Sequence, residues 1–552
     1  SVGPSCFTLL VASMCSEERP VFGDLSDKLL FESAERAAVR EQGLNVLREL
    51  VAESLQGSSD HADEGQWQLW ALGSYVVGTC SPTSDQDLVL ATCSSLPMDL
   101  EEVKDAVAKG LLELPGVHDL VRVETALVPL LTFVYEIDGV SIPFDLGFAR
   151  LPFKTLPSAA QDIKEHLLLS LDPRTVASIN GVRVAHELLK LVPDIKTFRI
   201  ALAVVKYWAK QRGLYSNKLG FLGGVSWSIL VAKAAVLYPK DSPEELVLHF
   251  FKMFATWSWN VPVRVVGLGD TSDWNVGCAI VTPTRPYFNT ARNMTATALE
   301  AITAELKRAL VLAEGVPVGK IHWGPVMAPF DVTCCREYIR VEAASSLLCD
   351  HAWHSAWAGY VEAQLRSLTL GVEANMTGVS LRPMPNVEDD EPNVTVFIIG
   401  VMPRPRMREQ CRMRLGQIVD QFARSLSMAA TPDCSVSFSL VGAREVWPER
   451  LSRAPLTDRT NKLSEPATTS KEPVIDGREA LKAALKEAVA DRLRESESEQ
   501  TLCGTPGSGR KRWLDEDQAK FRGQRRRDVP LPGGRTPTPE TDEESRELVF
   551  TS

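Results

Sequence analysis

The 552-residue chain has no apolar run of the roughly 18 residues that a membrane-spanning helix needs. Its best candidate, residues 6–14, is too short for a span. It also lacks the basic flank and the small-residue cleavage site of a secretory signal. The sequence therefore predicts that the protein has no membrane partner.

Cysteine pairs at metal-binding spacing are missing too. The 11 cysteines include no Cys-x-x-Cys, which argues against a zinc site and a disulfide framework and favours a reducing compartment. Positive charge is not in excess, because the formal net charge is −11. A surface that binds nucleic acid must therefore be local, and the basic residues are indeed clustered. The length predicts roughly three or four globular domains.

Two aspartates stand where an apolar strand begins. Asp85 and Asp87 precede the apolar residues 88–91 and, two apart in an extended strand, point to the same side. Two carboxylates so close together need a cation, and ligands of oxygen alone suit Mg²⁺. Upstream, Gly73 and Ser74 form a turn whose backbone N–H groups can face phosphate oxygens. Asp-x-Asp is common in acidic chains and Gly-Ser in turns. This motif alone is therefore also compatible with an ordinary turn that has no catalytic role.

Asp145 supplies a third carboxylate. Residues 132–137 are predicted to form a strand, Asp138-Gly139 a hairpin turn and residues 140–148 the returning strand. Asp145 lies within that apolar strand, where a charge needs a partner or a metal. Three acidic groups beside a Gly-Ser turn are the apparatus of two-metal nucleotidyl transfer, in which one ion activates the attacking hydroxyl and the other holds the triphosphate.

Residues 158–330 are rich in helix signals. Lys206 and Lys210 lie one turn apart on a predicted helix, so a nearby anion would relieve their repulsion, although two solvated lysines would give the same pattern. The glycine-rich residues 220–227 precede another helix. Glycines at that place suit either a ligand bound at the helix start or a tight contact between helices.

Residues 331–447 show the predicted order strand, helix, strand, strand, helix, strand. This is the ferredoxin-like plan of RNA-recognition folds, although the central strand, residues 394–399, lacks the usual stacking aromatics. A nearby basic cluster suits either a phosphate backbone or a solvated surface. It comprises Arg404, Arg406, Arg408, Arg412 and Arg414. His351 and His354 have ligand spacing, but no further ligand joins them, and we expect both to be exposed on a helix.

The residues after 451 are dominated by Ser, Thr, Glu, Lys, Pro and Gly, which predicts a disordered tail. Two basic clusters in it, residues 510–512 and 525–527, are spaced as in a bipartite nuclear import signal. A basic arm that binds RNA is the alternative, and the two roles are compatible.

Together these blocks resemble the nuclear poly(A) polymerases of eukaryotes, within the DNA polymerase β-like nucleotidyltransferase superfamily. Gly-Ser-Tyr-x-x-Gly at residues 73–78 and Ser-Asp-x-Asp-Leu at residues 84–88 look like the superfamily signature. Later blocks separate this family from uridylyltransferases. These blocks are residues 178–184, 206–212, 215–217 and 220–227. The resemblance covers residues 30–445.

The resemblance implies an α+β multidomain protein. We expect an N-terminal segment packed on the middle domain (residues 1–35) and an α/β nucleotidyltransferase catalytic domain (36–149). A helical middle domain (150–330) and a ferredoxin-like RNA-recognition-type domain (331–447) follow. The disordered tail with its bipartite basic signal is residues 448–552.

The resemblance also implies the site. It places catalytic metal binding on Asp85, Asp87 and Asp145. It places ATP contacts on Gly73, Ser74, Asn180, Lys206, Tyr215, Gly224 and Val225. We expect two Mg²⁺ ions, with Mn²⁺ as a possible substitute, and ATP as the substrate.

The implied activity is template-independent addition of AMP from ATP to the 3′ end of messenger RNA, with release of pyrophosphate. We expect a nuclear monomer that works with the mRNA cleavage and polyadenylation complex. Two alternatives stay open, a terminal uridylyltransferase with the same site and a catalytically inactive RNA-binding scaffold.

The chain departs from the family pattern at two places near the site. Leu72 stands where the family usually has Phe. The segment before Asp145 is two residues longer and contains Pro143. An even insertion keeps Asp145 on the same face, but a proline removes a ladder donor and predicts a strand edge or a bulge.

Overall fold

The computed structural model describes most of the chain between Phe22 and Val446. The described residues are 22, 25, 27–55, 65–123, 128–267, 278–316, 320–331, 334–335, 337–346, 349, 351–384, 393–402, 409–427 and 433–446. The predicted tail and its basic signal lie outside them, as do Arg404, Arg406, Arg408 and most of the N-terminal segment.

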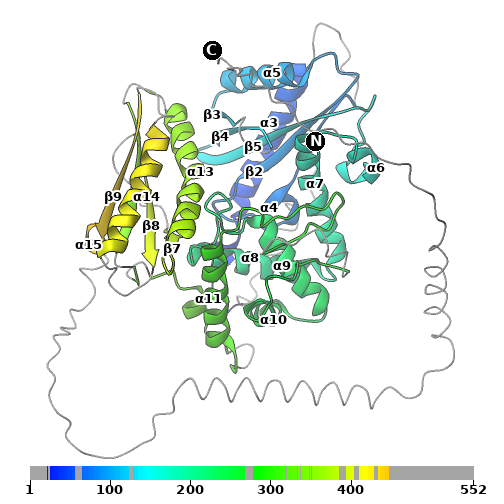
Figure 1. Ribbon diagram of the computed structural model, residues 1–552. Helices are drawn as coiled ribbons and strands as arrows, with labels where there is room; N and C mark the ends of the chain where they lie inside the picture. Colours follow the sequence, from blue (N-terminus) through cyan, green and yellow to red (C-terminus); the bar gives the residue numbers. More distant parts are fainter. Residues whose placement is uncertain are drawn as a thin grey trace, which may run out of the picture. The chain divides into compact units, whose positions relative to one another are not determined.

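A five-stranded sheet in the order β1-β2-β5-β4-β3 forms the centre of the first, α/β part. Its strands are β1 (Trp67–Ala71), β2 (Gln86–Cys93), β3 (Val117–Val123), β4 (Leu130–Ile137) and β5 (Val140–Leu151). β2 and β5 run parallel, and all other neighbours are antiparallel. Two helices, α3 (Ala34–Leu55) and α5 (Leu100–Glu113), cover one face of this sheet (Figure 1).

The two faces of this sheet have separate cores. Leu88 and Leu90 of β2 join the core beneath α3 and α5. Val89 and Ala91 face the opposite way and pack against α7 (Pro173–Leu191). Because side chains alternate along a strand, the odd-numbered Asp87 shares the α7 side of the sheet.

The predicted hairpin between β4 and β5 is confirmed. Asp138 and Gly139 both have positive φ, 52° and 77°, as a two-residue turn between antiparallel strands requires. Pro143 pairs with Val134 of β4, and β5 starts to pair with β2 only at Phe144. The proline therefore lies where β5 has a strand neighbour on one side only, as expected. The β4–β5 register runs through it without a bulge.

The middle part is helical. Its helices are α6 (Glu165–Leu168), α7, α8 (Ile195–Gln211), α9 (Gly224–Leu237), α10 (Pro243–Ala255), α11 (Ala296–Ala313) and α12 (Trp323–Met327), with a short 3-10 turn at Ala160–Asp162. Trp208 of α8 meets Trp227 of α9 and Phe251 of α10 edge-on at the centre of the core. Phe22 and the helix α2 (Asp27–Leu30) also pack on this core.

The third part is a four-stranded antiparallel sheet in the order β7-β8-β6-β9. Its elements are β6 (Glu337–Ser345), α13 (His351–Asn375), β7 (Ser380–Pro383), β8 (Val394–Met402), α14 (Glu409–Ser427), β9 (Cys434–Gly442) and α15 (Ala443–Val446). The order of strands and long helices is the predicted one. α13 and α14 lie on the same face of this sheet (Figure 1).

One expectation about α13 is wrong. His351 is exposed as predicted, but His354 is buried. Its ring contacts the Ser345 and Thr395 hydroxyls at 3.0 and 2.9 Å. The two hydroxyls satisfy the buried ring, and strand partners distant in sequence cannot be read from the spacing of two histidines.

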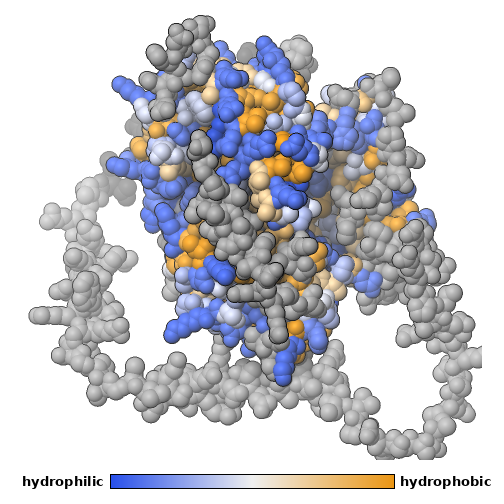
Figure 2. Space-filling model, turned by 180° about the vertical axis from the view of Figure 1, so that it is seen from behind, coloured by the Kyte–Doolittle hydropathy of each residue, from blue (hydrophilic) through white to orange (hydrophobic). Residues whose placement is uncertain are grey.

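The surface is mostly polar on the face seen in Figure 2, with hydrophobic residues in smaller patches between hydrophilic ones. Among the described residues, no helix is both long and apolar enough to cross a membrane.

Candidate active site

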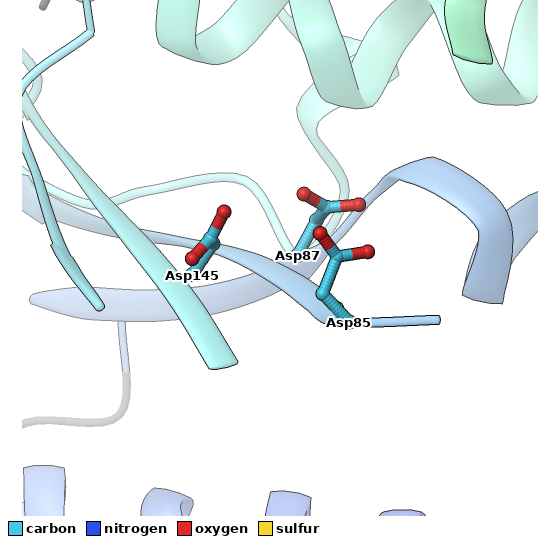
Figure 3. Close-up of side chains that lie close together, drawn as sticks. All are labelled: Asp85, Asp87 and Asp145. Atoms are coloured by element: carbon cyan, nitrogen blue, oxygen red, sulfur yellow. The ribbon is translucent and has the colours of Figure 1, made fainter. Parts of the chain in front are cut away.

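Three carboxylates meet on the α7 side of the first sheet (Figure 3). Asp87 and Asp145 are partners in register on the parallel strands β2 and β5. Asp85 stands just before β2. One carboxylate oxygen from each aspartate lies within 4.8 Å of the others. Among the described residues, this is the only group of three or more acidic, His or Cys side chains that close together.

The three negative charges repel one another, and two of them, those of Asp87 and Asp145, are half-buried. Burial, together with the charges of Asp85 and Asp145, raises the pKa of Asp87 to about 7. Burial also raises the pKa of Asp145 to about 6, with a contribution from Asp85. Such a cluster favours either protonation or a bound cation. The three carboxylates offer only oxygen ligands, which suit hard divalent ions such as Mg²⁺.

Gly73 makes the close approach to these carboxylates possible. It begins the short helix α4 (Gly73–Val77) with a φ of +65°. A Cβ atom at this position would collide with the carboxylate of Asp87. Only glycine combines the positive φ with the absence of a side chain there. Ser74 follows it in the wall of the same cavity, with its hydroxyl 3.5 Å from the Cys80 sulfur.

A cavity of about 730 Å³ opens beside Asp85 and Asp87. Residues of α2, α4, α7, α8 and the start of α9 complete its lining. The predicted ATP-contact residues in its lining are Gly73, Ser74, Lys206, Tyr215, Gly224 and Val225. The catalytic and helical parts of the chain thus share one cavity.

Lys206 is a cation in the lining whose charge acts on Asp87. Its ammonium group donates to the Thr79 hydroxyl at 3.1 Å. Burial lowers the pKa of Lys206 to about 8, against the opposing influence of nearby negative groups that include Asp87. An anionic ligand would favour the charged form, which indicates a place for phosphate.

Lys210 also lines the cavity, whereas the sequence alone left it undecided between an anion site and a solvated surface. Its ammonium group lies 3.3 Å from the hydroxyls of Ser81 and Thr83 and 5.4 Å from the centre of the Tyr215 ring. The spacing of one helical turn from Lys206 was the available signal. It did not distinguish a cavity lysine from a solvated one, because the loop that Lys210 contacts is more than 120 residues away in sequence.

Asn180 occupies a different position from the other predicted contacts. Its side chain is buried, and its Oδ1 accepts a hydrogen bond from the Thr284 hydroxyl at 2.7 Å. Its neighbour Gly181 lines the cavity. The hydrogen bond fixes the orientation of the Asn180 amide and leaves its NH₂ group as the free donor end.

The mixed sheet, the Gly-Ser helix start and the three converging carboxylates define a nucleotidyltransferase domain. Residues 17–192 match the family model described as "Poly(A) polymerase nucleotidyltransferase domain". Residues 197–329 match "Poly(A) polymerase central domain". The two matches together span more than half of the chain, which therefore belongs to the poly(A) polymerase family.

Curated relatives agree with this assignment. The chain is 31% identical over 386 residues to nuclear poly(A) polymerase 1 of Arabidopsis thaliana, covering 66% of this chain and 53% of that protein. It is 31% identical over 365 residues to a poly(A) polymerase of Dictyostelium discoideum, covering 62% of this chain and 44% of that protein. For poly(A) polymerase PAPalpha of Candida albicans the identity is 30%, covering 63% and 65%. The matched region thus spans about half the length of these relatives.

Among solved structures, the chain is similar to the RNA terminal uridylyl transferase Cid1. The sequence identity is 17% and the TM-score 0.40, covering 59% of this chain and 99% of that chain. A likeness this loose does not bear on which nucleotide the present cavity accepts.

Proposed function

We propose that the protein is a template-independent polynucleotide adenylyltransferase, which adds AMP from ATP to the 3′ end of messenger RNA and releases pyrophosphate. The observation that carries this proposal is the meeting of Asp85, Asp87 and Asp145 beside a cavity that Asp85, Asp87 and Lys206 line. The names of the curated relatives support adenylate as the transferred group.

Asp85, Asp87 and Asp145 are the residues that would hold two Mg²⁺ ions. When bound, these ions supply activation of the attacking hydroxyl and charge neutralisation at the triphosphate. Asp145 comes from β5 and Asp85 from the loop before β2, so they approach the shared site from different segments. We assign Asp145 to the side of the attacking 3′ hydroxyl, and Asp85 and Asp87 to both ions.

The side chains opposite the carboxylates bind the nucleotide. Lys206 and Lys210 neutralise the triphosphate, and the backbone at Gly73 and Ser74 approaches its oxygens. Tyr215, Gly224 and Val225 line the rest of the cavity. The Tyr215 hydroxyl lies against the Gly224 backbone, so a side chain at position 224 would displace it. Asn180 acts from behind this wall, with its amide oriented by Thr284.

The third part is proposed to be a ferredoxin-like RNA-recognition-type domain. The strand order β7-β8-β6-β9 with two helices on one face supports the ferredoxin-like plan. Its other face is occupied by the chain itself, because Phe330, Cys335 and Met384 pack there on Tyr338 and Ile398. RNA would therefore contact this domain through basic side chains rather than by stacking on the sheet.

The cellular setting is proposed from the relatives and the tail. Three of the matched relatives are named nuclear poly(A) polymerases, and the basic clusters at residues 510–512 and 525–527 suit nuclear import. We propose a nuclear protein that acts as a monomer with the mRNA cleavage and polyadenylation complex.

Primer extension tests the proposal. The purified full chain is given an oligo(A) primer and each of the four NTPs in turn, with Mg²⁺ and then with Mn²⁺. Metal-dependent incorporation of ATP above the other three is expected. Preference for UTP would establish the uridylyltransferase alternative, and no incorporation with any NTP or metal would contradict the proposal and favour the catalytically inactive scaffold.

A further inference from the structure

A buried arginine lies directly behind the carboxylate cluster. Arg40 of α3 is 0% exposed. Its Nε and Nη2 donate to the carboxylate of Glu32, with the shortest distance 2.9 Å. Its Nη1 donates to the backbone oxygen of Asp85 at 2.9 Å, and its Nη2 also donates to that of Ser84 at 2.8 Å.

We propose that Arg40, held in place by Glu32, is a positioning residue for the metal ligand Asp85. The inference rests on the proposed function, because it takes Asp85 as a ligand of the divalent ions. Arg40 touches neither the metal site nor the nucleotide cavity. It acts through the backbone that carries Asp85.

Asp85 needs such support more than the other two carboxylates. Asp87 and Asp145 lie inside the paired register of β2 and β5 and face each other there. The pairing of β2 with β5 begins only at Gln86, so Asp85 lies one residue beyond it. Asp85 is also the exposed member of the three. Arg40 adds two charge-assisted hydrogen bonds to the backbone at this end of the strand.

The arrangement requires a guanidinium group. A planar fork can donate to a carboxylate and to two consecutive carbonyl oxygens at once, whereas an ammonium group is a single point of charge. Glu32 compensates the buried positive charge, and its backbone N–H donates to the Cys80 oxygen at 3.0 Å. Glu32 and Arg40 together therefore hold both ends of the loop from Cys80 to Asp85.

The competing interpretation is that Glu32 and Arg40 are an ordinary buried ion pair that only stabilises the fold. The chain contains a matched control for this. Arg212 pairs with Glu305 through Nε and Nη2 at 2.8 and 3.0 Å. Its Nη1 donates to the two consecutive backbone oxygens of Ala328 and Pro329, both at 2.8 Å. This second pair has the same chemistry and lies away from the carboxylates.

The experiment compares Arg40→Lys with Arg212→Lys in the full chain. Mn²⁺ binding is measured by electron paramagnetic resonance without nucleotide, and thermal unfolding is measured in EDTA. We expect Arg40→Lys to weaken Mn²⁺ binding roughly ten- to a hundredfold, as loss of a group that orients a metal ligand does. Arg212→Lys should lower the melting temperature and leave Mn²⁺ affinity unchanged. Wild-type Mn²⁺ affinity in Arg40→Lys would overturn the inference, as would an equal loss in both variants.

The Mg²⁺ requirement of primer extension, compared with its kcat, gives a second readout. In Arg40→Lys, the Mg²⁺ concentration for half-maximal primer extension should rise, and excess Mg²⁺ should restore most of kcat. A lowered kcat with an unchanged Mg²⁺ requirement would contradict a positioning role. If Arg40→Lys does not fold, Glu32→Gln takes its place. Glu32→Gln keeps an acceptor for Arg40 but removes the charge of Glu32. The same weakening of Mn²⁺ binding is expected. Wild-type Mn²⁺ affinity in this variant would again overturn the inference.

Asp85→Asn separates this inference from the proposed function. If the wild-type chain and Asp85→Asn bind Mn²⁺ equally, Asp85 is no metal ligand and the proposed site is wrong. If Asp85→Asn loses binding while Arg40→Lys keeps it, only the positioning role of Arg40 is wrong.

Discussion

Asp87 and Asp145 lie side by side because β2 and β5 run parallel and pair these two residues in register. Neighbouring strands lie about 5 Å apart, which is a distance that one shared ion can bridge. The same register sets both half-buried carboxylates beside each other, and no residue that the structure describes places an opposing charge at hydrogen-bond distance from them. The strand pairing therefore builds a site that is unfavourable when empty and favourable when a cation is bound.

The repulsion among the three carboxylates predicts that Asp87→Asn has opposite effects on activity and stability. Primer extension should fall to background, because a metal ligand is lost. The free energy of unfolding without metal should rise by on the order of 1–2 kcal/mol, because one of three like charges is removed. Thermal unfolding in EDTA and extension in Mg²⁺ measure the two effects. Asp105→Asn, an exposed carboxylate paired with Arg122, serves as the control and should change neither.

Gly73→Ala should abolish primer extension and destabilise the fold by roughly 1–3 kcal/mol, because the new Cβ meets the Asp87 carboxylate at a backbone with positive φ. Gly139→Ala is the matched control. Its φ is +77°, but nothing lies within 4 Å of its added Cβ. It should cost about 1 kcal/mol of backbone strain and leave kcat unchanged. Equal activity of the two variants would show that the collision at Gly73 is harmless.

Nucleotide affinity should weaken as the pH rises through 8. Lys206 has a pKa lowered to about 8, so its ammonium group is charged below that pH and loses its charge above it. The attraction between Lys206 and the triphosphate is therefore present at pH 7 and fades at pH 9. The dissociation constant of ATP, measured at both pH values, tests this.

Two variants isolate the contribution of Lys206. Lys206→Met should bind ATP weakly, with little change between pH 7 and pH 9. Lys206→Arg keeps its charge over this range, so its affinity should also depend little on pH. A wild-type decline that persists in Lys206→Met would assign the titration to another group.

Glu305→Gln should destabilise the chain by about 3–5 kcal/mol, because it leaves buried arginines without their counter-charge. Glu305 pairs with Arg212 at 2.8 Å and with Arg382 at 3.2 Å, and all three side chains are buried. Glu362→Gln, at the more exposed pair with Lys218, should cost at most about 1 kcal/mol. Chemical denaturation measures both. Similar losses would show that burial does not set the strength of these pairs.

Much of the catalytic sheet follows from local sequence. The alternation around Asp85 and Asp87, the Asp138-Gly139 turn and the apolar strand carrying Asp145 predicted the two strands, the hairpin and the face of each carboxylate. These features depend on side-chain alternation and turn geometry, which act over a few residues. The order of elements in the third part was predictable for the same reason.

The tertiary structure alone decided which distant segments meet. It brings α8 against the loop of Ser81 and Thr83, which makes Lys210 a cavity residue. It also buries His354 against β6 and β8 and sets Arg40 behind Asp85. Most of these contacts join residues about 40 to more than 120 positions apart. They depend on the packing of whole helices and strands, which a short sequence pattern does not encode.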